Sequence, residues 1–170
     1  VIDKKIAGVS LELLGAGRTL ADKLDVPLAG ALLGHQVKDF AADLFAYGAD
    51  QVYVIDDPIL ENYRTEPYME GIMLLANKYK PEIFLYGATP NGKDLASAVA
   101  TDLATGLTAD TTMLDVDVEN RFLEASRPAF GGNIMATILC KKHRPQMATV
   151  RPKVMKALEP DNERTGKLVE

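Results

Sequence analysis

The sequence has 170 residues, of which 47% are hydrophobic and 25% are charged, and its formal net charge is −5. This composition is typical of one globular domain rather than a disordered chain, and the negative charge gives no reason to expect nucleic acid or an anionic membrane as a partner. The single cysteine, Cys140, excludes an internal disulfide and is typical of a reducing compartment. No apolar run approaches the ~20 residues of a membrane-spanning helix, and no signal peptide is visible.

The first two thirds of the chain alternate between helix and strand patterns. Apolar residues from Val9 to Leu24 recur at steps of three and four, which predicts an amphipathic helix. Further helices are predicted at residues 38–47, 67–79 and 94–103. Apolar runs predict strands at residues 27–33, 51–55 and 82–86, the first of them buried on both faces. This alternation predicts an α/β fold with a doubly wound, mostly parallel sheet.

The pattern changes after Gly106. Residues 111–118 alternate between apolar and polar, and residues 122–140 and 146–150 are typical of strands with no helix between them. We therefore expect additional antiparallel strands towards the C-terminus, as a sheet edge or a separate small sheet. The polar tail contains proline and glycine and is typical of a linker, so we expect an α/β domain at residues 1–158 and the start of a linker at residues 159–170.

The stretch Arg127–Ile138, RPAFGGNIMATI, is mostly apolar but carries an arginine and an asparagine. Arg127 precedes a proline, which favours an extended backbone. The pair Gly131 and Gly132 indicates a break or bulge in a strand. Two interpretations stay open: a hairpin with a kink, which is the commoner outcome, and a strand edge shaped against a partner or cofactor.

Residues with catalytic chemistry are sparse. The turn at residues 87–92 lies between a strand and a helix, where α/β sheets bind phosphates, but its spacing matches neither G-x-G-x-x-G nor the P-loop. A tight turn with Asn91 as the helix cap is the simpler interpretation. Asp110, Asp115 and Asp117 could suggest metal ligation, but Asp115 and Asp117 alternate on the polar face of a predicted strand, so carboxylates facing water are the simpler interpretation. The sequence predicts neither a self-contained catalytic site nor a metal site.

Four motifs, in order along nearly the whole chain, resemble the α subunit of electron transfer flavoprotein. They are GATPNGKDLA at residues 87–96, TGLTAD at 105–110, RPAFGGNIMA at 127–136 and RPQMATVRP at 144–152. The resemblance implies a Rossmann-like or adenine-nucleotide α-hydrolase-like domain that packs on a β subunit in a heterodimer. It also implies a second, FAD-binding domain that this sequence does not cover, and an opening strand before the first helix that is missing here. This domain alone is not expected to hold FAD.

The resemblance implies a cytoplasmic bacterial protein that passes electrons between acyl-CoA or other dehydrogenases and acceptors. RPAFGGNIMAT is similar to the bacterial forms that include electron-bifurcating flavoproteins, and in that branch Arg127 would lie beside the β subunit's flavin. A simpler role for Arg127 is an ion pair with Glu124 or with the partner protein. The expected interface residues are Phe130, Gly131, Gly132, Asn133 and Met147.

Two other functions stay open. One is a stand-alone adenine-nucleotide-binding domain that uses the Gly87–Asp94 turn for phosphate. The other is a purely structural module that holds two mobile parts together.

Overall fold

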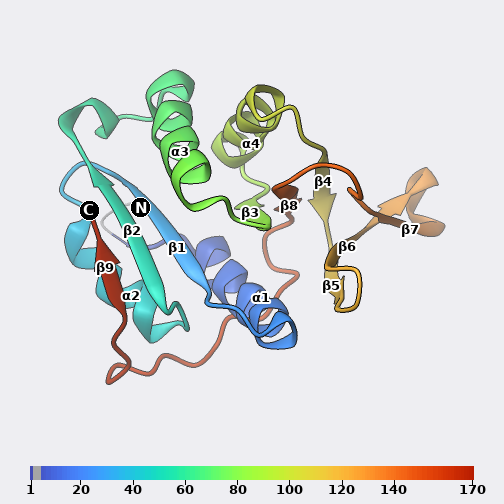
Figure 1. The fold of residues 1–170 in the computed structure, drawn as a ribbon, viewed down its shortest axis with the longest axis horizontal. Coiled ribbons are helices and arrows are strands. Elements are labelled where there is room, and N and C mark those ends of the chain that lie inside the picture. The colour runs from blue at the N-terminus through green and yellow to red at the C-terminus, as the bar shows by residue number, and fades with distance from the viewer. Residues whose placement is uncertain (2–4) are drawn as a thin grey trace.

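Parallel strands lie between two layers of helices in the computed structural model, which describes Val1 and residues 5–170 (Figure 1). The helices are α1 (Gly8–Leu24), α2 (Ala41–Ala46), α3 (Thr65–Tyr79) and α4 (Pro90–Asp102). Short 3₁₀ turns occur at Lys38–Phe40, Pro58–Leu60 and Phe130–Gly132. The strands are β1 (Ala29–Gly34), β2 (Gln51–Asp56), β3 (Ile83–Gly87), β4 (Leu107–Thr111), β5 (Met113–Asp117), β6 (Phe122–Ala129), β7 (Ile134–Ile138), β8 (Gln146–Val150) and β9 (Lys167–Val169).

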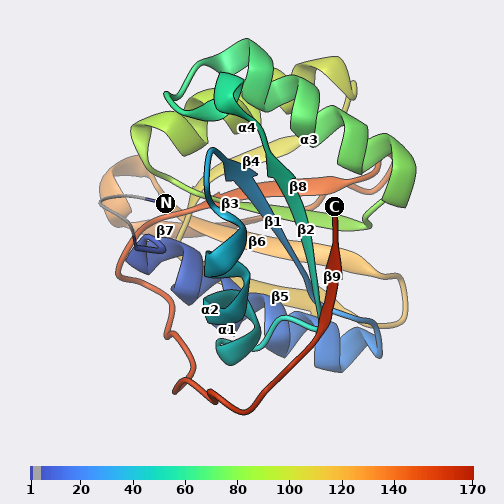
Figure 2. The same ribbon diagram turned by 90° about the vertical axis from the view of Figure 1, so that its left-hand side faces the viewer.

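The strands form three sheets of three strands, in the orders β1-β2-β9, β3-β8-β4 and β5-β6-β7. The first two sheets are parallel and the third is antiparallel. Helices α3 and α4 lie on one side of the parallel strands and α1 and α2 on the other (Figures 1 and 2). The predicted α/β fold with additional antiparallel strands is confirmed.

The ends of the helices follow from local sequence. Helix α1 ends at Asp25, which adopts a left-handed conformation with φ 53°, as short polar side chains do at helix C-termini. Helix α4 begins at Pro90, four residues earlier than expected, and its cap is Thr89 rather than Asn91. The Thr89 hydroxyl accepts a hydrogen bond from the Gly92 N–H at 3.1 Å, and proline at the first helical position loses no helix bond.

Strand β8 is the exception among the strands expected after Gly106 to form an antiparallel edge or a separate small sheet. It runs parallel between β3 and β4, and all five of its residues are buried. Its polar residues have partners: the Gln146 side chain accepts from the Leu123 N–H at 2.8 Å and donates to the Arg121 carbonyl at 2.9 Å. Strand β4, which no apolar run predicts, completes this sheet.

Strand β1 is buried on one face only. Gly30 and Leu32 are buried, whereas Ala29 and Ala31 are exposed. The prediction of a strand buried on both faces is therefore wrong: among the described residues β1 pairs only with β2, so this strand lies at the edge of its sheet.

The polar tail packs on the domain in place of the expected linker. Strand β9 extends the sheet beside β2, the Asp161 N–H donates to the Ala46 carbonyl at 2.9 Å, and Arg164 pairs with Asp50 at 2.7 Å. Residues 161–169 therefore contact the domain in this structure, and a linker towards a further domain stays a prediction. No helix in the described part of the chain is long and apolar enough to cross a membrane.

Candidate functional site

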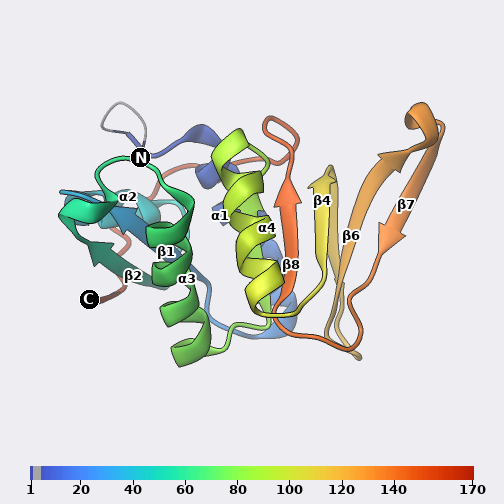
Figure 3. The ribbon, with the colours of Figure 1, turned by 90° about the horizontal axis from the view of Figure 1, so that it is seen from above.

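The candidate site is the projecting hairpin of residues 127–138, which we call the finger, together with the charged residues at its base. The finger comprises the end of β6, a 3₁₀ turn and β7, with Arg127 opposite Ala136 and Ala129 opposite Ile134. It points away from the parallel sheets (Figure 3). Gly131 and Gly132 have φ of 71° and 92°, a region that glycine enters without a steric penalty. Of the two interpretations, the hairpin describes the local structure.

The finger exposes an apolar surface. Phe130 at its tip is 81% exposed, and Ile134 and Met135 are each more than half exposed. Gly131, Gly132 and Asn133 are also exposed, so four of the five expected interface residues lie together at the tip. Large exposed apolar side chains gathered on one projecting segment are typical of an interaction surface.

Met147 does not belong to this surface. It is only 2% exposed and packs in a core cluster with Ile72, Tyr86 and Val99. Its strand, β8, lies in the middle of a parallel sheet, so the expectation that Met147 contacts a partner is wrong.

Arg127 lies at the base of the finger and is half-buried. It does not pair with Glu124: residues three apart along a strand point to opposite faces, and Glu124 lies opposite Asp115 in the sheet. The positive charge of Arg127 instead acts on Asp110. Arg151 donates to both oxygens of that carboxylate, at 2.7 and 3.3 Å, and Lys93 lies 4.0 Å from it.

We group these four side chains because Arg151 and Lys93 contact the Asp110 carboxylate and the charge of Arg127 also acts on it. The pKa of Asp110 is lowered, first by its hydrogen bond from Arg151 and then by the charges of Arg151, Lys93 and Arg127. Three positive charges and one negative charge leave an excess of two positive charges at the base of the finger. We call this group the Asp110 cluster.

A β-bulge places Asp110 in the cluster. The register of β4 against β8 shifts between Thr108 and Thr111, and Asp110 has φ 60°. Its N–H donates to the Thr149 hydroxyl at 2.8 Å. A bulge redirects a side chain out of the regular alternation, so Asp110 meets Arg151 rather than facing water as expected. Sequence spacing alone gave no sign of this contact.

The residues of the Gly87–Asp94 turn pack closely against one another. A side-chain Cβ at Gly92 would lie 2.0 Å from the Gly87 carbonyl oxygen, and the Gly92 N–H is already bound to Thr89. Asp94 accepts hydrogen bonds from Tyr63 and Thr65, both at 2.6 Å. The pKa of Tyr63 is raised to about 12 by burial and by its bond to Asp94.

The charged side chains of the described residues do not form a metal site. No group of three or more histidine, cysteine, aspartate or glutamate side chains among them could hold a metal ion. Asp115 pairs with Lys23 at 2.6 Å and Asp117 binds the Asn120 N–H at 3.0 Å, so both carboxylates have local partners.

Comparison with known proteins places the chain in one family. The family model described as electron transfer flavoprotein domain matches residues 2–170. Electron transfer flavoprotein subunit alpha of Thermoanaerobacterium thermosaccharolyticum is 54% identical over 97% of this chain and 50% of its own length. The subunit alpha of Clostridium acetobutylicum is 53% identical over 92% of this chain and 46% of its own length, and protein FixB of Azorhizobium caulinodans is 52% identical over 95% and 44%. The chain spans about half the length of these relatives.

Proposed function

The chain belongs to the electron transfer flavoprotein family, and on that premise we propose that it is the first domain of an α subunit that packs on a β subunit. The intact heterodimer passes electrons between dehydrogenases, of the acyl-CoA or another type, and their acceptors. The observation that carries this proposal is the family match over nearly the whole chain together with an exposed apolar finger that lies within the most family-like motif.

The finger is the proposed contact with the β subunit. From residue 128 to residue 138 it carries no charged side chain, and the cores of protein interfaces are depleted in charge and enriched in aromatic side chains. Phe130 is the natural anchor because it is the most exposed large apolar residue in the described part of the chain. Burying such a side chain contributes about 1.5–3 kcal/mol.

FAD is the proposed cofactor of the heterodimer, in which it accepts and donates electrons. The residues of this chain are suited to contact one side of a flavin that is bound mainly by another chain or domain. The Asp110 cluster offers an excess of positive charge beside an exposed apolar surface, but the finger does not enclose a ring. A fixed guanidinium near a bound flavin stabilises negative charge on the ring and can also stack on it. We assign this role to Arg127.

The motif RPAFGGNIMAT favours the electron-bifurcating branch of the family, in the bacterial cytoplasm. Arg127 is the residue on which this proposal rests, since it lies half-buried at the base of the finger and its charge also acts on Asp110.

The interface proposal is tested by placing a charge on the tip of the finger. In an intact α subunit that contains this domain, Phe130→Asp should weaken binding to the β subunit at least tenfold, because the aspartate would be desolvated without a partner. Leu74→Asp is the matched control, since Leu74 is 61% exposed on α3, away from the finger. Calorimetric titration measures both affinities. Equal binding by the two variants would contradict the proposal.

The competing interpretation is a stand-alone nucleotide-binding domain. The closed Gly87–Asp94 turn offers it few free backbone donors, since the Gly92 N–H is occupied. Titrating this chain with AMP, ATP and FAD separates the two functions. Micromolar binding without a β subunit would favour the nucleotide-binding domain.

A further inference from the structure

The antiparallel sheet of β5, β6 and β7 separates its charges between its two faces. Residues opposite one another in paired strands share a face, and so do residues two apart along a strand. By the observed register, every acidic side chain of these strands lies on one face, where Asp115 is opposite Glu124 and Asp117 is opposite Phe122. The other face carries Arg127 as its one charged residue within the described strands. We call it the Arg127 face.

The Arg127 face is covered at one end and open at the other. Near the turn between β5 and β6 it packs against α1, in a core cluster that includes Leu20, Leu24, Val116, Leu123 and Ala125. Farther along, the same face belongs to the finger, where Ile134 is 54% exposed and Ile138 is 40% exposed. Exposed apolar side chains that continue a buried face are suited to pack against a partner.

Backbone hydrogen bonds bring two further strands to the base of the open half. The Arg151 N–H donates to the Thr111 carbonyl at 2.9 Å. The Thr112 N–H donates to the Ser126 carbonyl, also at 2.9 Å. Arg151 follows β8, Thr111 ends β4, and Ser126 directly precedes Arg127 in β6. The Asp110 cluster therefore lies beside the Arg127 face, at the point where the finger begins.

The Asp110 cluster makes this region positive. Arg151 pairs with Asp110 at 2.7 Å, and the Lys93 amine lies 4.0 Å from the same carboxylate. One carboxylate offsets one of the three cations, which leaves an excess of two positive charges. The Lys93 side chain is 50% exposed, so a group on another protein can reach it. A partner that covered these cations without an opposite charge would remove water from them at a cost in free energy.

We propose that the β subunit covers the open half of the Arg127 face with a segment that is apolar opposite Ile134 and Ile138 and carries an aspartate or glutamate that pairs with Lys93. The identity of the partner rests on the proposed function, whereas the chemistry of the contact comes from the Arg127 face and the Asp110 cluster. Opposite charges on the two surfaces also speed the encounter of the subunits, and salt screens this effect.

Charge reversal at Lys93 tests the pairing. In an intact α subunit that contains this domain, Lys93→Glu should lower the rate constant for association with the β subunit about fivefold in ~10 mM salt and have little effect in ~1 M salt, where the Debye length is only ~3 Å. Lys78→Glu is the matched control, because it makes the same change in net charge at an exposed position on α3, away from the finger (Figure 3). Stopped-flow mixing of the two subunits measures the rate constants.

Asp110→Asn should act in the opposite direction. It raises the excess positive charge of the Asp110 cluster from two to three, so association in low salt should become about twofold faster. A folding defect would slow association, so a faster rate separates the effect of charge from damage to the fold. Asp117→Asn is the matched control, because it removes one negative charge from the other face of the sheet.

Carbodiimide cross-linking tests whether the partner group is a carboxylate, because this reagent joins a lysine amine to a carboxylate in contact with it. In the heterodimer, Lys93 should be linked to an aspartate or glutamate of the β subunit, which mass spectrometry of the cross-linked peptides identifies. Links between the subunits at other lysines, without one at Lys93, would overturn the proposal.

The kinetic variants give a second way to overturn it. The proposal fails if Lys93→Glu and Lys78→Glu associate alike in low salt, or if Asp110→Asn is no faster than Asp117→Asn. Phe130→Asp distinguishes this failure from failure of the proposed function. If Phe130→Asp weakens binding and the charge variants change nothing, only the acidic contact is wrong. If none of these variants changes binding, the finger does not contact the β subunit and both proposals fail.

Discussion

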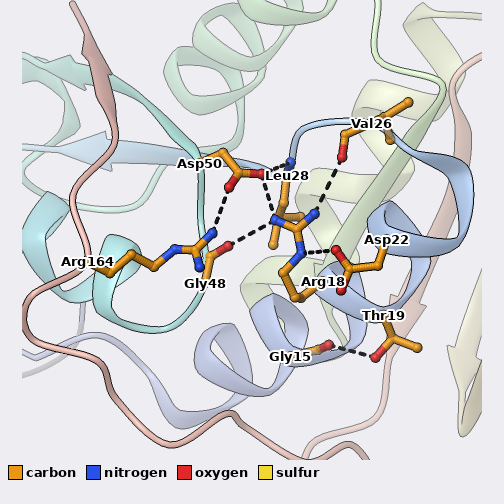
Figure 4. A network of polar contacts seen from close by, with 9 residues as sticks. All are labelled: Gly15, Arg18, Thr19, Asp22, Val26, Leu28, Gly48, Asp50 and Arg164. Atoms are coloured by element: carbon orange, nitrogen blue, oxygen red, sulfur yellow. Dashed lines mark hydrogen bonds and ion pairs between the residues drawn. The ribbon is translucent and has the colours of Figure 1, made fainter.

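Asp50 shows how one carboxylate can tie together segments that are distant in sequence (Figure 4). Its Oδ2 atom accepts from the Leu28 N–H at 2.8 Å and from Arg18 at 2.6 Å, and its Oδ1 atom accepts from Arg164 at 2.7 Å. Burial by itself would raise the pKa of Asp50, but the hydrogen bonds from Leu28 and Arg18 outweigh burial and lower it. The ionised carboxylate therefore stabilises the junction of α1, β1, β2 and the tail.

Replacing this carboxylate should destabilise the fold in a pH-dependent way. Because the folded pKa of Asp50 is lowered, its contribution is present above the unfolded pKa of about 3.9 and is lost as the pH falls through the folded value. Asp50→Asn should lower the free energy of unfolding by about 1–2 kcal/mol at neutral pH, and the difference should shrink in strong acid. Urea unfolding of both proteins at neutral pH and in strong acid measures this difference in the free energy of unfolding.

Asp22→Asn is the control for Asp50→Asn, because the Asp22 side chain is 66% exposed and, within the described residues, pairs with Arg18 alone. It should cost no more than about 0.5 kcal/mol. A loss for Asp50→Asn that is equal at both pH values would mean that packing, not charge, accounts for its effect.

At the scale of elements, the sequence predicts the helices and strands whose own residues show a clear apolar pattern. Helix α1 and strand β2 follow from periodic apolar residues and are found where expected. Strands β8 and β9 depend on distant partners: β8 buries Gln146, which is satisfied by Arg121 and Leu123, and β9 has only three residues in a polar segment. The bulge at Asp110 likewise arises from pairing with β8. None of these contacts is visible in local spacing.

The tail should detach when its ionic anchor is removed. Arg164→Ala breaks the pair with Asp50, and β9 contributes only a short edge pairing with β2. The backbone of residues 159–170 should then open more often and be cleaved several times faster in limited proteolysis. Glu163→Ala is the control, since Glu163 bonds to the Asp161 carboxylate through its backbone N–H, which the substitution keeps. Equal cleavage rates in the two variants would show that the ion pair contributes little and that backbone contacts of the tail hold it in place.

At the scale of the whole molecule, charge and apolar surface are distributed unevenly. The chain carries a net charge of −5, yet the Asp110 cluster has an excess of positive charge at the base of the apolar finger. The finger lies at the opposite side of the domain from β1, β2 and β9 (Figure 3). A partner that covered the finger would also exclude water from Arg127, and a charge acts more strongly in a less polar environment. The charge of Arg127 would then act mainly on groups of the partner that lie at this interface.

Arg127→Ala in the heterodimer proposed above tests this arrangement, in which Arg127 lies beside a flavin of the β subunit. Loss of a fixed cation should make the reduction potential of the β-subunit flavin more negative, because negative charge on the reduced ring is no longer stabilised. A loss of ~1.4 kcal/mol corresponds to about 30 mV for a two-electron couple, while the flavin of the α subunit should remain nearly unchanged. Spectroscopic redox titration measures both potentials.

Arg121→Ala is the control, because Arg121 precedes the start of β6, at the end of the strand away from the finger, and pairs with Glu82 at 2.9 Å. If the Arg127→Ala dimer assembles normally and neither potential moves, Arg127 contributes only to the surface of the domain.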